Sequence, residues 1–166
     1  MKRYMITLTV AGSVLATAST ACLAAAPQPT AKIADGASHT KTVSIEGDVP
    51  QSPGKVWQAI TQSQILAKWL MKTDFKPVVG QAFKFTADWG AVDGKVLTVQ
   101  PKKKLAYTWS AYGLNSVVTW TLSPKGAGTH VRMAQAGFPA NQPQYYQGAQ
   151  GGWQKYFGDL KTVLAH

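Results

Sequence analysis

The most constraining feature of this sequence is a long region in which apolar and polar residues alternate between short turn-like links. Between residues 83 and 135, successive segments place large, mostly apolar side chains at every second position. Such alternation is typical of half-buried β-strands, whose neighbouring side chains point to opposite faces of a sheet. The predicted inward positions are Phe83, Phe85, Ala87 and Trp89; Leu105, Tyr107 and Trp109; Val118, Trp120 and Leu122; and Val131, Met133 and Gln135.

Turn residues divide this region further. The Asp93-Gly94 pair is a strong hairpin-turn signal, and residues 101–104 and 124–128 contain the Pro, Gly and Lys of short links. Residues 96–100 form one more apolar-rich segment between two of these turns. The sequence therefore predicts about five antiparallel strands in succession.

A helical period replaces the alternation at the C-terminal end. Trp153, Phe157, Leu160 and Leu164 recur at positions i, i+4, i+7 and i+11, which places them on one buried face of a long helix. Three glycines precede this stripe, and each costs about 1 kcal/mol relative to alanine inside a helix. Close approach to the sheet, a mobile gate and a frayed first turn all remain open as reasons for them. They are Gly148, Gly151 and Gly152.

One more strand and two short helices precede the alternating region. Apolar and polar residues alternate over residues 42–47. Ser52 and Pro53 suit the N-cap and the first position of a helix, and Ser63 is a candidate cap for a second one over residues 63–70. The whole order predicts an α+β domain in which a curved antiparallel sheet packs against the long last helix.

The N-terminus has the layout of a secretory signal peptide. Lys2 and Arg3 precede a mostly apolar stretch, and small residues follow it, so cleavage is expected between Ala21 and Ala26. Two alternatives stay open: lipidation at Cys22, or an uncleaved anchor helix. We therefore expect a protein exported to the periplasm or the extracellular space.

The chain divides into three predicted regions. Residues 1–26 are the predicted signal peptide, residues 27–39 a flexible tether rich in Ala, Pro and Thr, and residues 40–166 one folded domain. A single domain of this length has room for a hydrophobic core. A multidomain enzyme, a repeat solenoid and a multi-span membrane protein are excluded.

Composition narrows the functions further. The 166 residues include 17 Lys plus Arg against 7 Asp plus Glu, a formal charge of +10. Cys22 is the only cysteine, so the mature domain has no internal disulfide and no thiolate nucleophile or thiolate metal site. Arg3 and Arg132 are the only arginines, so the basic surface is almost entirely lysine. Lysine is a flexible point charge that suits bidentate phosphate recognition less well than arginine does.

Short motifs along the domain are similar, in order and spacing, to those of one known family. They cover the two short helices, the strands and the closing helix, and the stretch from residue 94 to residue 109 is the most specific. The motifs are Val56–Thr61, Leu66–Trp69, Gly80–Phe83, Gly94–Leu97, Pro101, Leu105–Trp109, Gly128–Val131 and Gly152-Trp153.

These motifs resemble the START-like, or SRPBCC, superfamily, and within it the branch named after the activator of the 90-kDa heat-shock-protein ATPase. The resemblance implies a helix-grip fold: a curved antiparallel sheet wrapped around a long C-terminal helix, with two short helices after the first strand. It also implies an internal cavity for an apolar or amphipathic small molecule. Co-chaperone activity does not fit a signal peptide, because an exported domain meets neither that chaperone nor ATP.

A small hydrophobic ligand is the function that we expect first. One helix cannot fill such a sheet completely, and ligand pockets are lined mainly by aromatic and apolar groups with a few polar anchors. Ordinary core packing is the simpler interpretation for most of these side chains, and Tyr107 and Gln135 are the predicted polar anchors. The predicted cavity lining is Trp69, Phe85, Trp89, Tyr107, Trp109, Trp120, Met133, Gln135, Phe138, Trp153 and Phe157.

Two other functions remain open. A cyclase-like or hydrolase-like enzyme would use Tyr107, Gln135 or Asp88 for proton transfer, although the sequence contains no nucleophile-elbow motif and we assign no catalytic residue. A chaperone-like envelope protein would instead use its lysine-rich face to bind a partner.

Three consecutive lysines raise the question of a charged partner. Contact with an anionic membrane is one expectation, and a solvated hairpin tip explains the same run more simply. Nucleic acid is not expected, because arginine is nearly absent. The histidines show no metal-ligand spacing, so neither a metal nor a cofactor is expected. The lysines are Lys102, Lys103 and Lys104, and the histidines are His39, His130 and His166.

Overall fold

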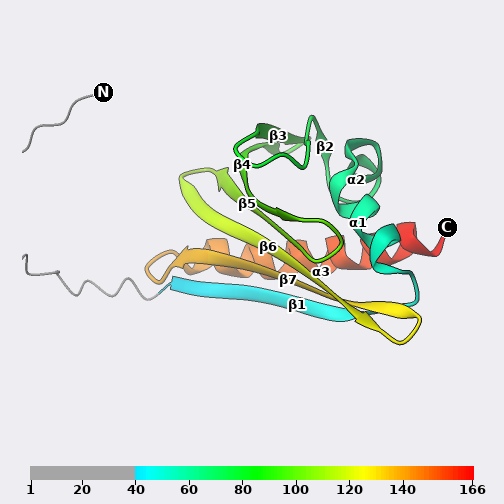
Figure 1. Cartoon of the computed structure of the whole chain (residues 1–166). Helices are drawn as coiled ribbons and strands as arrows, with labels where there is room; N and C mark the ends of the chain where they lie inside the picture. The colour runs from blue at the N-terminus through cyan, green and yellow to red at the C-terminus, as the bar shows by residue number, and fades with distance from the viewer. Residues whose placement is uncertain (1–39) are drawn as a thin grey trace, which may run out of the picture. The chain divides into compact units, whose positions relative to one another are not determined.

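The structure is a computed structural model that describes residues 40–166. The predicted signal peptide with Cys22, and the predicted tether, lie outside the described residues. Figure 1 shows the elements in their order along the chain. They are β1 (Thr40–Val49), α1 (Pro53–Thr61), α2 (Ser63–Trp69), β2 (Lys72–Thr73), β3 (Ala82–Ala87), β4 (Gly90–Gln100), β5 (Lys104–Ala111), β6 (Leu114–Lys125), β7 (Gly128–Pro139) and α3 (Pro143–Ala165).

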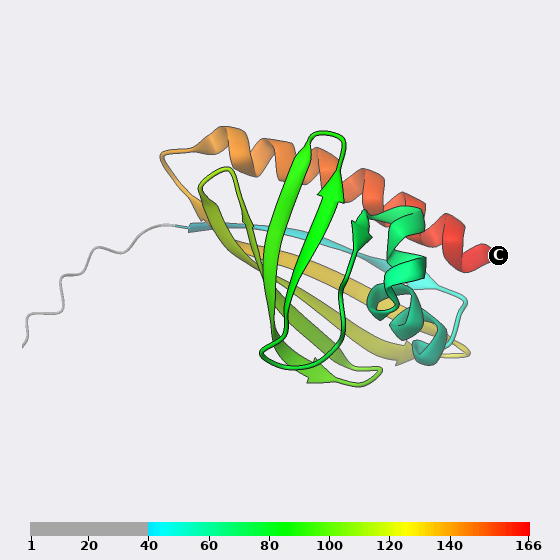
Figure 2. The same ribbon diagram turned by 90° about the horizontal axis from the view of Figure 1, so that it is seen from above.

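The strands form one antiparallel seven-stranded sheet in the order β1-β7-β6-β5-β4-β3-β2. The first strand pairs with the last one, so that Thr40 lies opposite Pro139 and Val49 opposite Thr129. Figure 2 shows α3 running along one side of the curved sheet, with the β3–β4 hairpin reaching across towards it. This arrangement confirms the predicted helix-grip fold; the two-residue strand β2 is an addition that the sequence does not predict.

The two short helices form where their caps predict. The Ser52 hydroxyl accepts a hydrogen bond from the Lys55 amide at 3.4 Å, and Pro53 is the first residue of α1. Ser63 is the first residue of α2 rather than its cap. The Trp69 indole donates to the Ala59 carbonyl at 2.9 Å and so fastens α2 to α1. None of the helices in residues 40–166 is long and apolar enough to cross a membrane.

The position of Gly94 corrects one prediction. The sequence predicts a turn at Asp93-Gly94, but both residues lie within β4, and the chain reverses instead at Asp88 and Trp89. Phe83 lies directly opposite Gly94, and a Cβ atom there would overlap its ring. The glycine is therefore needed for close packing of an aromatic ring and not for a turn.

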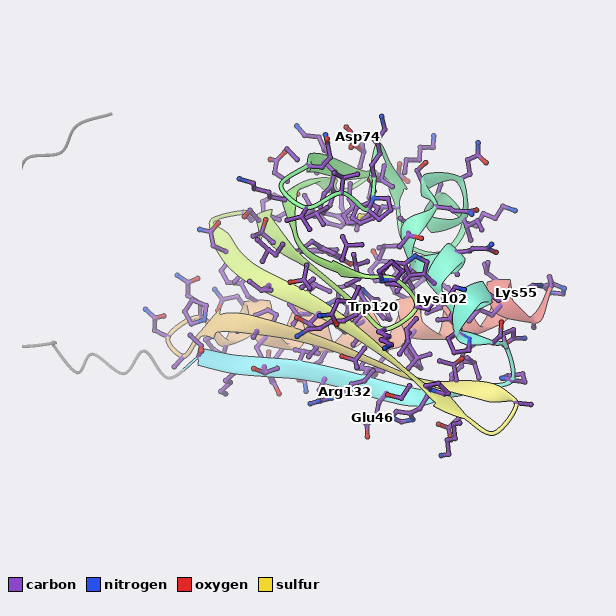
Figure 3. All side chains as sticks on the ribbon, viewed as in Figure 1. Glu46, Lys55, Asp74, Lys102, Trp120 and Arg132 are labelled. Carbon is purple, nitrogen blue, oxygen red and sulfur yellow. The ribbon has the colours of Figure 1, made fainter. Side chains whose placement is uncertain are left out.

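Aromatic rings dominate the core between the sheet and α3. The stripe predicted for α3 is buried at all four positions, Trp153, Phe157, Leu160 and Leu164. The Trp120 ring lies 5.8 Å from that of Trp69 and 5.9 Å from that of Trp153, edge to face in both cases, and Figure 3 labels it in the middle of the core. Trp120 thus joins α2, the sheet and α3.

We predict that Gly94→Ala lowers the free energy of unfolding by about 1–3 kcal/mol, because the new methyl group displaces the Phe83 ring. Urea unfolding followed by tryptophan fluorescence measures this change. Gly151→Ala is the control: it lies on the exposed side of α3 with nothing within 4 Å, and it is expected to stabilise the protein by up to about 1 kcal/mol. A Gly94→Ala protein as stable as the unchanged one would contradict the packing argument.

Candidate functional site

A cavity of about 390 Å³ lies between the first half of α3 and the tips of two hairpins, β3–β4 and β5–β6. Strand β7 contributes one residue to its wall. Most of its lining is aromatic or small. The lining residues are Trp89, Trp109, Ala111, Tyr112, Leu114, Gln135, Gln144, Tyr145, Gly148, Ala149, Gly152, Trp153 and Tyr156.

The space beside α3 is unfilled on the cavity side, because the residues there have small side chains or none. Gly148, Ala149 and Gly152 face it. A Cβ atom at Gly148 would meet nothing within 4 Å, and at Gly152 only the Tyr156 ring, at 4.0 Å. These glycines do not serve close approach to the sheet, and they lie inside α3, beyond its first turn. Their effect is to leave space empty beside the helix.

A chain of buried hydrogen bonds forms the polar part of the wall. The Trp153 indole donates from Nε1 to Gln135 Oε1 at 2.5 Å. Gln135 donates from Nε2 to Ser116 Oγ at 2.8 Å, and Ser116 donates to the Trp109 carbonyl at 3.0 Å. A primary amide has two N–H groups, so this chain uses one and leaves the second for another acceptor. Gln135 is therefore a polar anchor set into an apolar wall.

The mouth of the cavity is formed by aromatic side chains at the two hairpin tips. Trp89 is 48% exposed and Tyr112 is 66% exposed, with ring centroids 6.2 Å apart. The Tyr112 hydroxyl donates to the Trp89 carbonyl, and the Tyr145 hydroxyl of α3 donates to the Tyr112 carbonyl at 2.7 Å. These two bonds connect β3–β4, β5–β6 and α3, so three distant segments share one rim.

Tyr112 adopts a backbone conformation that costs free energy. Its φ is +51°, and that of Gly113 is +81°, as a type I′ hairpin turn requires at both central positions. Asn, Asp and Gly are the usual residues at the first of these positions, and a tyrosine there is uncommon. The hydrogen bonds of the Tyr112 hydroxyl and carbonyl hold the side chain and the turn in place.

Four of the predicted cavity residues line this cavity: Trp89, Trp109, Gln135 and Trp153. The other seven are buried in the core. They do not line this cavity. These seven are Trp69, Phe85, Tyr107, Trp120, Met133, Phe138 and Phe157.

Tyr107, a predicted polar anchor, is not among the residues that line the cavity. Its hydroxyl accepts a hydrogen bond from Trp120 Nε1 at 3.1 Å within the closed core. Burial raises the pKa of the Tyr107 hydroxyl far above its usual value. Tyr107 therefore stays neutral within the core. Asp88, the other residue considered for proton transfer, is exposed in the β3–β4 turn.

The predicted lining left out most residues of the hairpin tips and of the first half of α3, although Gly148 and Gly152 were already singled out with a gate among their possible roles. Alternation identifies strand interiors, but the rim lies where the strands end. The Tyr112-Gly113 pair, between two alternating segments, was the one signal for a turn there. The residues left out are Ala111, Tyr112, Leu114, Gln144, Tyr145, Gly148, Ala149, Gly152 and Tyr156.

The charged side chains of the described residues lie outside the cavity. Among the described residues that line the cavity, none carries a carboxylate, an amine or an imidazole. On the outer face of β1 and β7, Asp48 contacts Lys125 at 2.5 Å and His130 at 2.7 Å. The hydrogen bond from Lys125 is the largest cause that lowers the pKa of the Asp48 carboxyl, and the hydrogen bond from His130 is the second. Figure 3 labels Glu46 and Arg132 on this outer face, where they form an ion pair at 3.6 Å.

The profile of one protein family, described as Activator of Hsp90 ATPase homolog 1-like protein, matches residues 50–165. The chain belongs to this family. The resemblance predicted from the sequence motifs is thereby confirmed. A comparison with curated proteins found no match.

Solved structures agree with membership of the Activator of Hsp90 ATPase homolog 1-like family. Protein MLL2253 from Mesorhizobium loti is 45% identical, with a TM-score of 0.73, over 75% of this chain and 97% of that chain. CalU16 from Micromonospora echinospora is 21% identical, with a TM-score of 0.67, over 75% of this chain and 76% of that chain. The Aha1 dimer from Colwellia psychrerythraea is 22% identical, with a TM-score of 0.68, over 75% and 96%. The last two likenesses show the fold alone.

We predict that Trp153→Phe lowers the free energy of unfolding by about 1–3 kcal/mol, because Gln135 loses a buried hydrogen-bond donor. Urea unfolding followed by circular dichroism measures this change. The matched control is Trp89→Phe at the exposed rim, for which we expect a change within about 0.5 kcal/mol. Equal stability of the two variants would show that the Trp153–Gln135 bond contributes nothing to the fold.

Proposed function

We propose that this protein binds one small, uncharged, largely apolar molecule in the cavity beside α3. The observation that carries the proposal is the space left by Gly148, Ala149 and Gly152 opposite a wall of aromatic rings. Glycine inside a helix costs about 1 kcal/mol relative to alanine. Larger side chains here would both stabilise α3 and close the cavity. The empty space therefore exists because these positions carry small side chains or none.

The lining indicates the chemistry of the ligand. Rings of Trp89, Trp109 and Trp153 offer flat apolar surfaces, and Gln135 offers one free amide N–H. A charged ligand would lose its hydration without gaining an ion pair, because the described lining carries no charged side chain. We propose a neutral molecule with an aromatic or other flat apolar part and one hydrogen-bond acceptor.

Binding is favoured over catalysis by the same lining. Proton transfer needs an ionisable group near its working pH, within hydrogen-bond reach of the reacting atom. Among the three residues considered for this role, Gln135 does not ionise, Tyr107 is enclosed in the core and Asp88 is exposed in a turn. We therefore propose a carrier or sensor.

We predict that filling the space abolishes binding. The neutral fluorescent probe N-phenyl-1-naphthylamine is expected to bind the unchanged protein with one saturable site. Gly148→Leu with Gly152→Leu is expected to weaken this binding at least tenfold, because both new side chains enter the cavity. Fluorescence titration measures the Kd.

The same helix provides a matched control. Gly151→Leu with Gly158→Leu makes the same chemical change at two exposed positions of α3 where a Cβ meets nothing within 4 Å. Both double variants gain similar helix propensity, so thermal melting should show neither to be less stable than the unchanged protein. Equal loss of probe binding in both, or no loss in either, would refute the cavity as the binding site.

We also propose that the domain works outside the cytoplasm, since residues 1–26 have the layout of a signal peptide. The intact mass of the protein purified from the cell envelope should correspond to a chain that starts between residues 22 and 27. A start at Cys22 with the added mass of acyl chains would identify lipidation. A full-length mass would contradict cleavage.

A further inference from the structure

One end of the β3–β4 hairpin carries exposed valines beside lysines for which no ion pair is found within residues 40–166. Because β3 and β4 are antiparallel, the loop before β3 and the turn after β4 lie at the same end of these strands. The hairpin tips that form the cavity mouth lie at the other end. Figure 2 shows the loop before β3 and the turn after β4 at the same end. We call this end the lysine edge; its members are Lys55, Lys76, Val78, Val79, Leu97, Lys102, Lys103 and Lys104.

The apolar part of the lysine edge is a rigid tip. Val78 and Val79 are 57% and 61% exposed. The Val78 amide donates to the Lys76 carbonyl at 2.8 Å, and the Gln81 amide donates to the Val78 carbonyl at 3.0 Å. Gly80 has a φ of +85°, as the third position of a type II turn requires. Two successive tight turns thus hold both valines at the surface. Their exposure therefore follows from the backbone hydrogen bonds of these turns.

The tip is fixed to β4. The Gly80 amide donates to the Val96 carbonyl at 2.8 Å, and the Val96 amide donates to the Gln81 carbonyl at 2.9 Å. The neighbouring Leu97 lies at a bulge in the pairing of β4 with β5 and is 42% exposed. From Leu97, β4 continues for a few residues to the turn that carries the lysines. At the usual rise per residue of a strand, Leu97 and the start of this turn are about 13 Å apart. The valine tip, Leu97 and the lysine turn therefore follow one another along the second half of β4.

The charge of the lysine edge is not neutralised. A Cβ at Gly54 would lie 3.9 Å from Lys102 Cε, so the Lys102 side chain reaches the start of α1, which carries Lys55. Figure 3 labels Lys55 and Lys102 near α1. The ion pairs found in residues 40–166 use other cations: Lys84, Lys125, His130, Arg132 and Lys155.

We propose that the lysine edge docks the protein on an anionic lipid bilayer, with Val78 and Val79 entering the interface and the lysines contacting headgroups. Lysines near an anionic surface each strengthen binding, and exposed apolar side chains add a contribution that salt does not screen. Aliphatic tips without arginine forks or stacking aromatics fit a bilayer better than a nucleic acid. The cavity mouth lies at the opposite end of β4 and stays clear of the surface.

Sedimentation with vesicles tests this proposal. The unchanged protein is expected to bind vesicles of equal parts phosphatidylglycerol and phosphatidylcholine at low salt, and pure phosphatidylcholine vesicles much more weakly. Lys102→Gln, Lys103→Gln and Lys104→Gln together should weaken binding about 100-fold, since each lysine near the surface contributes about fivefold. Absence of binding to the anionic vesicles would overturn the proposal.

The control removes the same charge elsewhere. Lys41→Gln, Lys155→Gln and Lys161→Gln change three lysines of β1 and α3, and binding should fall by no more than about threefold. Every variant carries the same residues 1–39, so any contribution of that region cancels in the comparison. Equal losses in the two triple variants would show that net charge alone drives binding and would overturn the proposal.

The valines are tested separately. Val78→Ser with Val79→Ser should remove most of the binding that persists at high salt, and thermal melting should be unchanged because both side chains are exposed. Unchanged binding at high salt would exclude insertion of the tip. Binding of the N-phenyl-1-naphthylamine probe should be the same in all these variants, which separates failure of the membrane proposal from failure of the cavity proposal.

Discussion

The hydrogen bond from Trp153 to Gln135 is the interaction on which the rest of the structure depends. It joins the middle of α3 to β7 in a buried region, where an unpaired indole or amide would cost more than the bond itself gains. Through Ser116 the same chain reaches Trp109. The distance between helix and sheet is thereby fixed at one point, with a packed core on one side of it and a cavity on the other.

The two halves of α3 have opposite tasks. The second half carries Phe157, Leu160 and Leu164 and packs with the sheet and the two short helices. The first half carries glycines and Ala149 and leaves the space beside it unfilled. A single helix thus stabilises the fold with one end and provides a binding surface with the other.

The sequence predicted most of the fold and part of the site, for physical reasons. Alternation and helical period are local properties, so the strands, the buried stripe of α3 and the Ser52 cap follow directly from them. The prediction of a turn at Gly94 was wrong. A glycine is needed there because the Phe83 ring of a neighbouring strand leaves no room for a side chain, and no local sequence pattern reveals this contact. Tyr107 and Gln135 both point inward, and only the three-dimensional packing shows that one is enclosed by Trp120 and the other faces the cavity.

The bonded rim of Trp89, Tyr112 and Tyr145 has a consequence for the timing of ligand exchange. These hydrogen bonds join groups of the protein to one another, so they hold the rim whether or not a molecule lies within. An interaction that is the same in the free and the occupied state leaves the equilibrium constant unchanged. A molecule that enters between Trp89, Tyr112 and Tyr145 has to break these bonds, so they slow its arrival and its departure alike. The rim residues Trp89, Tyr112 and Tyr145 can therefore set how long a ligand stays bound. Residues of the cavity wall, such as Gln135, can set its affinity.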